Sequence, residues 1–258
     1  MSPLHLELFT VDSFTQTPFR GNPAAVCFLT DPSIVQLIDE RFPTSEQKED
    51  FYKLVAREMN LSETCFLRRV ANQAENYFEL RWFTPTVEVN LCGHATLAAA
   101  HLLFEQGNVV GVDHFKFTTR SGELTVEKVD GKLKMNFPEG DPQVLNSEMS
   151  PELVGELLKN LNLPNDASIV SELVLCRKTK KLLVVLKDLK HVLQAEPNEQ
   201  ALLQMNFKSD DLNAHIKGIS VNMPVSTMDD ESKKVLSGLV TDVNVDEVDF
   251  ITRYFSPW

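Results

Sequence analysis

The stretch Val89-Asn-Leu-Cys-Gly-His-Ala-Thr-Leu-Ala-Ala-Ala-His-Leu-Leu-Phe-Glu-Gln-Gly107 decides how this chain of 258 residues folds. Apolar side chains recur on nearly every side of a helix drawn through it. The sequence therefore predicts a helix over residues 92–106 that lies buried inside a domain. Gly107 can take the left-handed conformation that commonly ends a helix. We expect a domain organised around this one central helix.

The start of that helix offers three chemically useful groups. Cys92 carries a thiol, Gly93 lets other groups approach the backbone closely, and His94 carries an imidazole. The N–H groups of a first helical turn have no partner within the helix and attract anions. The same residues could also serve only for capping and packing, so the helix pattern alone leaves both interpretations open.

Length and charge limit what the chain can do. With 258 residues, 43% of them hydrophobic, it can form two domains, and the turn-rich stretch from Pro138 to Pro142 predicts a boundary between 1–138 and 139–258. A formal charge of −12, from 37 acidic and 25 basic residues, argues against nucleic acid or an anionic membrane surface as a partner. The longest apolar run is far shorter than the ~20 residues of a membrane span.

The cysteines indicate a reducing compartment. None of the four belongs to a Cys-x-x-Cys motif, and four thiols in a chain of this size do not resemble a disulfide framework. The first residues lack the basic and then apolar pattern of a secretory signal. We therefore expect a cytoplasmic protein. The cysteines are Cys27, Cys65, Cys92 and Cys176.

Two eight-residue segments repeat one another. Phe78-Glu-Leu-Arg-Trp-Phe-Thr-Pro85 matches Phe250-Ile-Thr-Arg-Tyr-Phe-Ser-Pro257 at four identical and two similar positions. The first copy alternates like a half-buried strand and leads directly into the central helix. The repeat predicts two domains built on one plan. By contrast, Met228 to Val248 is acidic and weakly patterned, and we expect a surface segment there.

Four motifs carry a resemblance to a known family. They are Gly-Asn-Pro-Ala-Ala-Val at 21–26, Met-Asn-Leu-Ser-Glu-Thr at 59–64, Arg-Trp-Phe-Thr-Pro at 81–85 and Leu-Cys-Gly-His-Ala-Thr at 91–96. In this order and spacing they resemble the PhzF-like isomerases of phenazine biosynthesis. The resemblance is clear from Leu4 to about Phe137, thinner through the second half, and returns at Arg253–Trp258.

The resemblance implies an α+β fold similar to that of diaminopimelate epimerase. Two similar domains each wrap an antiparallel sheet around a central helix, and the active site lies between them. In the family, a second central helix follows the segment that matches Arg253–Trp258. This chain has no such stretch, so we expect the second domain to lack its central helix.

The resemblance also implies the chemistry. A carboxylate moves a proton on a small carboxylate-bearing substrate, without cofactor or metal, and a homodimer is possible. By position, Glu63 matches the catalytic general acid/base and His94 the site histidine, which can orient a substrate carboxylate or stabilise an enolate. Gly93, Cys92 and Asn22 are placed at the substrate-binding site.

Other interpretations remain open for these residues. Glu63 could be an ordinary surface acid, and His94 could simply bond a nearby carbonyl. Cys92 matches a catalytic cysteine of epimerases that use two opposed thiols, but we expect a packed free thiol here, with activation as a nucleophile as the alternative. No metal-ligating set is evident, because His94 and His101 lack a carboxylate or thiol at ligand spacing on the same helical face. The whole chain could also be a non-catalytic binding protein with half of the site.

Overall fold

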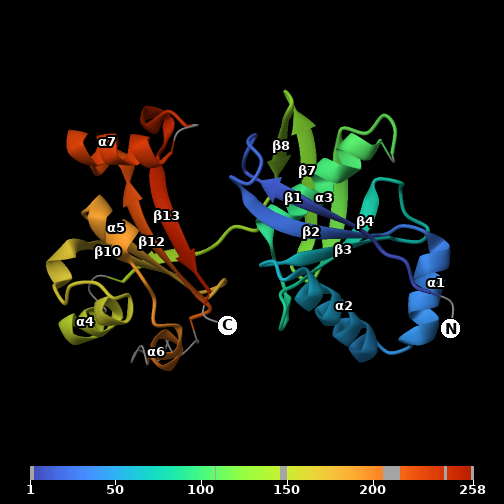
Figure 1. The fold of residues 1–258 in the computed structure, drawn as a ribbon, viewed down its shortest axis with the longest axis horizontal. Coiled ribbons are helices and arrows are strands. Elements are labelled where there is room, and N and C mark those ends of the chain that lie inside the picture. Colours follow the sequence, from blue (N-terminus) through green and yellow to red (C-terminus); the bar gives the residue numbers. More distant parts are fainter. Residues whose placement is uncertain (1–2, 108, 146–149, 206–215, 241–242, 257–258) are drawn as a thin grey trace. The chain divides into compact units, whose positions relative to one another are not determined.

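The computed structural model describes residues 3–107, 109–145, 150–205, 216–240 and 243–256. The chain divides into two compact units, Met1–Pro138 and Glu139–Trp258 (Figure 1). Each unit contains one β-sheet and its own buried core. Among the helices of the described part, none combines the length and the apolar character that a bilayer crossing needs.

The sheet of the first unit has eight strands in the order β1-β2-β3-β4-β6-β7-β8, with β5 paired to β4. Most neighbours along the chain form antiparallel pairs. The strands are β1 (Glu7–Ser13), β2 (Asn22–Leu29), β3 (Thr64–Arg69), β4 (Tyr77–Phe83), β5 (Glu88–Val89), β6 (His114–Thr119), β7 (Gly122–Val129) and β8 (Lys132–Met135).

Both sheets are mixed, whereas the prediction was of antiparallel sheets. β2 runs parallel to β3, β4 runs parallel to β6, and β11 (Lys181–Leu186) runs parallel to β12 (Gly218–Pro224) in the second unit. In each case one or two helices lie between the paired strands in the sequence. A helical crossover brings the chain back to the edge from which it started, so the next strand runs in the same direction.

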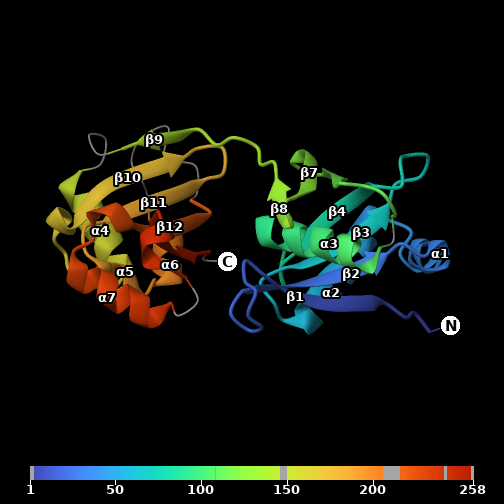
Figure 2. The same ribbon diagram turned by 90° about the horizontal axis from the view of Figure 1, so that it is seen from above.

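Helix α3 (Gly93–Gln106) forms the core of the first unit and matches the predicted central helix within one residue. Its small side chains pack against the inner face of the sheet, where Phe78, Leu80 and Trp82 of β4 are fully buried. The helix is not covered on every side, because His101 is exposed. Figure 2 shows α3 lying along one face of the sheet.

The opposite face of this sheet carries α1 (Pro32–Arg41) and α2 (Ser45–Met59). A capping box begins α2, in which Thr44 accepts from the backbone of Gln47 and the Gln47 side chain accepts from the backbone of Thr44. Tyr52 and Ala56 of α2 pack on Phe66 and Phe83. The first unit is therefore a three-layer structure with the sheet in the middle.

The second unit has a five-stranded sheet in the order β13-β12-β11-β10-β9. The four helices of the described part contribute to one core with one face of this sheet, and Figure 2 shows them on the same side. The remaining elements are β9 (Pro142–Val144), α4 (Pro151–Asn160), β10 (Val170–Cys176), α5 (Leu189–Gln194), α6 (Glu199–Gln204), α7 (Asp230–Leu239) and β13 (Phe250–Phe255).

Four strands of the two sheets are arranged alike. The pairs β1–β2, β2–β3 and β3–β4 are antiparallel, parallel and antiparallel, and so are β10–β11, β11–β12 and β12–β13. The repeated segments therefore form β4 and β13, at equivalent places, although Pro257 lies outside the described residues.

The face of the first sheet that packs against α3 is buried, whereas the corresponding face of the second sheet is exposed. Phe250 and Tyr254 of β13 are 58% and 46% exposed, whereas their counterparts Phe78 and Trp82 are buried against α3. No helix covers that face of the second sheet within the residues described here.

Residues 228–248, interpreted as a surface segment, also contain a helix that the sequence analysis did not predict. Helix α7 lies within this segment, and Asp229 caps the helix by accepting from the Ser232 N–H. Only Leu236 is buried among the residues of α7. The helix therefore lies mostly at the surface, as the acidic composition of the segment indicated.

Candidate active site

Glu63 lies in the short connection between α2 and β3. α2 ends at Asn60, whose left-handed backbone (φ 51°) turns the chain out of the helix. The Glu63 carbonyl then accepts a hydrogen bond from the Ala25 N–H at 3.2 Å, which fixes this connection against β2. The backbone of Glu63 is thus positioned by the end of α2 and by β2. Its side chain is 20% exposed.

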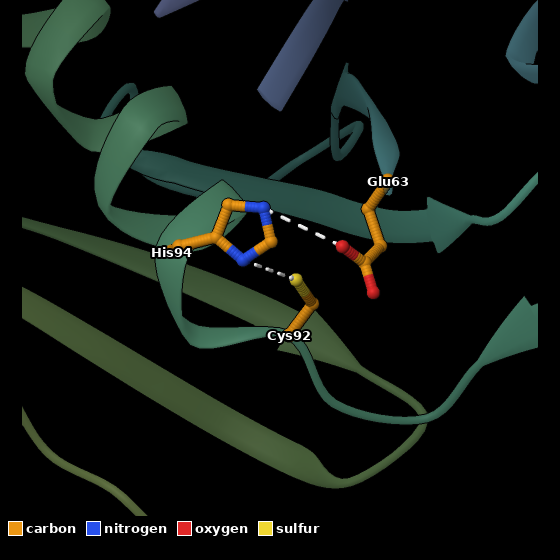
Figure 3. Close-up of side chains that lie close together, drawn as sticks. All are labelled: Glu63, Cys92 and His94. Atoms are coloured by element: carbon orange, nitrogen blue, oxygen red, sulfur yellow. Dashed lines mark hydrogen bonds and ion pairs between the residues drawn. The ribbon is translucent and has the colours of Figure 1, made fainter. Parts of the chain in front are cut away.

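His94 comes to the same place from the first turn of α3. Its Nε2 lies 3.4 Å from Oε2 of Glu63, and the residue is 8% exposed. The Ser13 hydroxyl donates to the His94 carbonyl at 2.7 Å and ties this turn to the end of β1. Figure 3 shows the imidazole and the carboxylate facing each other.

Cys92 lies at the other edge of the imidazole. Its Sγ is 3.4 Å from Nδ1 of His94, the ring nitrogen that does not face Glu63 (Figure 3). The residue is buried and occupies the N-cap position of α3. One donor atom from each of the three side chains lies within 4.8 Å of the other two, so thiol, imidazole and carboxylate form a compact cluster.

Burial decides the charge of the imidazole. Removal from water lowers the pKa of His94, and this effect exceeds the opposing influences of the Glu63 carboxylate and of a hydrogen bond to the Pro23 carbonyl. His94 is therefore neutral at pH 7. A neutral imidazole has one N–H donor and one acceptor nitrogen, so it can donate a hydrogen bond without carrying a full charge.

The other two predicted site residues differ in their placement. A Cβ added at Gly93 would lie 2.9 Å from Cζ of Phe137, so this glycine does permit a close approach, by an aromatic ring of the same unit. Asn22 begins β2, pairs with Ser13 and is exposed. Within the described residues its side chain makes no hydrogen bond to Glu63, Cys92 or His94.

The structure brings together three potential metal ligands that the spacing along the sequence does not indicate. Glu63, Cys92 and His94 each offer one ligand atom, and these atoms all lie within 4.8 Å of one another. Along its own helix His94 has no ligand partner at helical spacing. The tertiary structure brings Glu63 in from a different segment, which spacing along the chain cannot indicate.

Three further residues around His94 were missed. The Ser62 hydroxyl lies 3.4 Å from Nε2, Ser13 holds the His94 carbonyl, and the Pro23 carbonyl accepts from the ring. Ser62 and Pro23 belong to the motifs at 59–64 and 21–26, so a closer analysis of those motifs could have included them. Ser13 lies 81 residues from His94 and gives no signal in the sequence.

The start of α3, like that of the short helix α5, lacks the side-chain cap that most helices of the described part have. Its N-cap residue, Cys92, makes no side-chain capping hydrogen bond, whereas α1, α2, α4 and α7 are capped by an Asp, Thr or Ser side chain. The first-turn N–H groups of α3 thus lack this internal acceptor next to His94 and Glu63. An anionic group would find hydrogen-bond donors and the positive end of the helix dipole there.

Comparison with known proteins places the chain in one family. A family model described as phenazine biosynthesis-like protein matches residues 11–258. A phenazine biosynthesis-like domain-containing protein of Homo sapiens is 32% identical over 263 residues, which cover 99% of this chain and 77% of that protein. An uncharacterized isomerase of Pseudomonas aeruginosa is 37% identical over 205 residues, which cover 80% of this chain and 66% of that protein.

A solved structure agrees with these sequence matches. The crystal structure of a PhzF-family phenazine biosynthesis protein of Enterococcus faecalis matches with a TM-score of 0.65 and 29% identity. The match covers 98% of this chain and 74% of that one. The similarity therefore includes both units of the chain.

Proposed function

Because the chain belongs to the family of phenazine biosynthesis-like proteins, we propose that it is an isomerase that moves a proton on a small carboxylate-bearing substrate, with Glu63 as the general acid/base. The observation that carries the proposal is the pairing of Glu63 with His94. Their facing atoms are 3.4 Å apart at a largely buried helix start. Proton transfer at carbon needs a general base, here the carboxylate, and a hydrogen-bond donor for the negative charge that develops on the substrate.

Each group has a distinct part in the reaction. Glu63 removes the proton from an acidic carbon and returns it to another carbon on the same face, so the substrate gains and loses no electrons. The neutral His94 has a single N–H, and in the reaction this N–H leaves the Pro23 carbonyl and donates to the oxygen that gains negative charge as the proton leaves. The first-turn N–H groups of α3 bind the substrate carboxylate. The chemistry requires no group from outside the chain.

The test is exchange of solvent deuterium into substrate carbon. The purified chain is incubated in D₂O with a panel of α-amino acids and small cyclic carboxylic acids, and incorporation is followed by mass spectrometry. Any compound that exchanges is repeated with Glu63→Gln, which keeps the shape of the side chain but removes its basicity. We expect the exchange rate to fall by about 10²–10⁴-fold, the usual contribution of a general acid/base.

The matched control is Glu75→Gln, which removes the charge of an exposed glutamate in the same unit. This variant should exchange at the rate of the unaltered chain. Exchange that survives Glu63→Gln refutes the assignment of Glu63. Loss of exchange on Cys92→Ser alone would instead favour Cys92 as the reacting group.

The same panel separates catalysis from binding. A non-catalytic protein would exchange no compound, and a partner captured by the chain would remain bound after both Glu63→Gln and His94→Ala. An isomerase would show exchange that depends on Glu63 and is absent with heat-denatured protein. The two functions thus predict opposite results for one pair of variants.

A further inference from the structure

We propose that Glu63, Cys92 and His94 form a binding site for a Zn²⁺-class divalent cation. Their donor atoms are a carboxylate oxygen, a thiol sulfur and an imidazole nitrogen, all within 4.8 Å of one another. These are the three ligand types that zinc takes in proteins. The thiolate disfavours Mg²⁺ and Ca²⁺, which require oxygen ligands.

The geometry needs only a small adjustment to accept an ion. Zinc bonds of about 2.0–2.3 Å in a tetrahedral site place ligand atoms roughly 3.3–3.8 Å apart. The Glu63–His94 and Cys92–His94 separations are already 3.4 Å, although they involve different ring nitrogens. Since one ion uses one ring nitrogen, the Cys92 or Glu63 side chain must move by about 1 Å to share it.

The surroundings of the cluster favour a bound ion. Cys92 and His94 are 7% and 8% exposed, so little water competes for their donor atoms. The imidazole also donates to the Pro23 carbonyl. A carbonyl partner of this kind commonly fixes the orientation of a metal-ligating histidine. Three protein ligands would leave a fourth position open to water or to an anion.

Occupancy would switch off the proposed isomerase, and this consequence, unlike the binding itself, rests on the proposed function. Binding releases the thiol proton of Cys92 and engages the lone pairs of Glu63 that would accept the substrate proton. The cation therefore competes with proton transfer. The site would be active when empty and inactive when a zinc-class ion is bound.

The experiment is titration of the metal-free, full-length chain with Co²⁺, without substrate. Co²⁺ bound to a thiolate gives a sulfur-to-metal charge-transfer band in the near ultraviolet, and Zn²⁺ should displace the ion and abolish the band. We expect one equivalent of Co²⁺ to bind. Cys92→Ser should remove the band, and Glu63→Gln should weaken binding at least tenfold, as loss of even an outer partner commonly does.

Matched controls use residues of the same type outside the cluster. Cys176→Ser and His101→Gln should leave the band and the affinity unchanged. A band that survives Cys92→Ser, a band lost in Cys176→Ser, or no band in the unaltered chain overturns the proposal. Circular dichroism checks that each variant is folded, and Cys92→Ala replaces Cys92→Ser where the latter does not fold.

The result is independent of the deuterium exchange test. Exchange in the metal-free chain without Co²⁺ binding refutes only the metal site. Co²⁺ binding without exchange of any compound refutes only the isomerase. Where both occur, added Zn²⁺ should stop the exchange and a chelator should restore it, and persistent exchange would contradict the inhibitory role.

Discussion

His94 is neutral because α3 begins inside the first unit. Its ring is buried between Cys92 and Glu63, and the cost of removing a charged imidazole from water outweighs the attraction of the nearby carboxylate. The site consequently combines one group that accepts a proton with one that donates a hydrogen bond. Free histidine could not guarantee this state at mildly acidic pH, because its pKa is about 6.5.

This burial predicts a pH dependence of stability. The pKa of His94 is lower in the folded chain than in the unfolded chain, so below pH 6.5 the unfolded chain binds more protons at this residue. The free energy of unfolding should therefore fall as the pH decreases. We expect a steeper fall between pH 7 and pH 5 for the unaltered chain than for His94→Gln, as measured by urea denaturation. His101→Gln, which changes an exposed histidine of α3, should keep the slope of the unaltered chain. Identical slopes for His94→Gln and the unaltered chain would contradict the prediction.

Other residues of the family motifs serve the fold. Arg81 forms ion pairs with Glu49 and Glu88, and Glu88 is almost completely buried. Trp82 and Phe83 are buried on opposite faces of the sheet. This part of the motif fixes β4, β5 and α2 together just ahead of Cys92. The position of the site therefore depends on residues that do not touch it.

At the scale of elements, β4 and β13 place related residues in different surroundings. Trp82 is 1% exposed under α3, and Tyr254, its counterpart in the repeat, is 46% exposed. Tyr254 retains a contact with the Lys181 ammonium, 4.6 Å from the ring centroid. The same strand thus contributes to a core in one unit and to a surface in the other.

This contrast predicts that alanine substitutions at Trp82 and at Tyr254 lower the free energy of unfolding by different amounts. Trp82→Ala should lower the free energy of unfolding by about 3–5 kcal/mol, because it empties a filled core position. Tyr254→Ala should cost at most about 1 kcal/mol, the value of an exposed cation–π contact. Urea denaturation of the full chain, followed by a probe in each unit, measures both. A cost for Tyr254→Ala similar to that for Trp82→Ala would show that its face is covered in solution.

At the scale of the whole molecule, the buried residues divide cleanly. The two clusters of the first unit contain only residues before Pro138, and the cluster of the second unit contains only residues after Glu139. The candidate site also lies entirely within the first unit. Each unit therefore has the hydrophobic burial that independent folding requires.

We accordingly predict that residues 1–138 fold when expressed alone. Hydrogen exchange measured by mass spectrometry should give the amides of β2, β3 and α3 similar protection in this fragment and in the full chain. The control is residues 1–90, which omit α3 and should exchange rapidly. Loss of protection in 1–138 would mean that the first unit depends on the second.

Much of the first unit could be predicted from sequence because its signals are local. The apolar circumference of residues 92–106 indicated the central helix, Thr44 to Gln47 indicated the start of α2, and the alternation in 77–83 indicated β4. The parallel strand pairs could not be predicted this way, because the direction of a neighbour depends on crossovers many residues long. Helix α7 was not predicted, because the acidic composition of residues 228–248 was interpreted as a surface segment.

The sequence by itself determined the family, the central helix and the identity of the reactive groups at its start, since each is carried by residue types in a short stretch. Only the tertiary structure decided how those groups meet. Glu63 is about thirty residues from His94 in the chain, yet a left-handed turn at Asn60 and a backbone hydrogen bond to Ala25 set the two side chains 3.4 Å apart. Burial there, which no local pattern encodes, lowers the pKa of the imidazole, and the fold brings carboxylate, thiol and imidazole within 4.8 Å of one another.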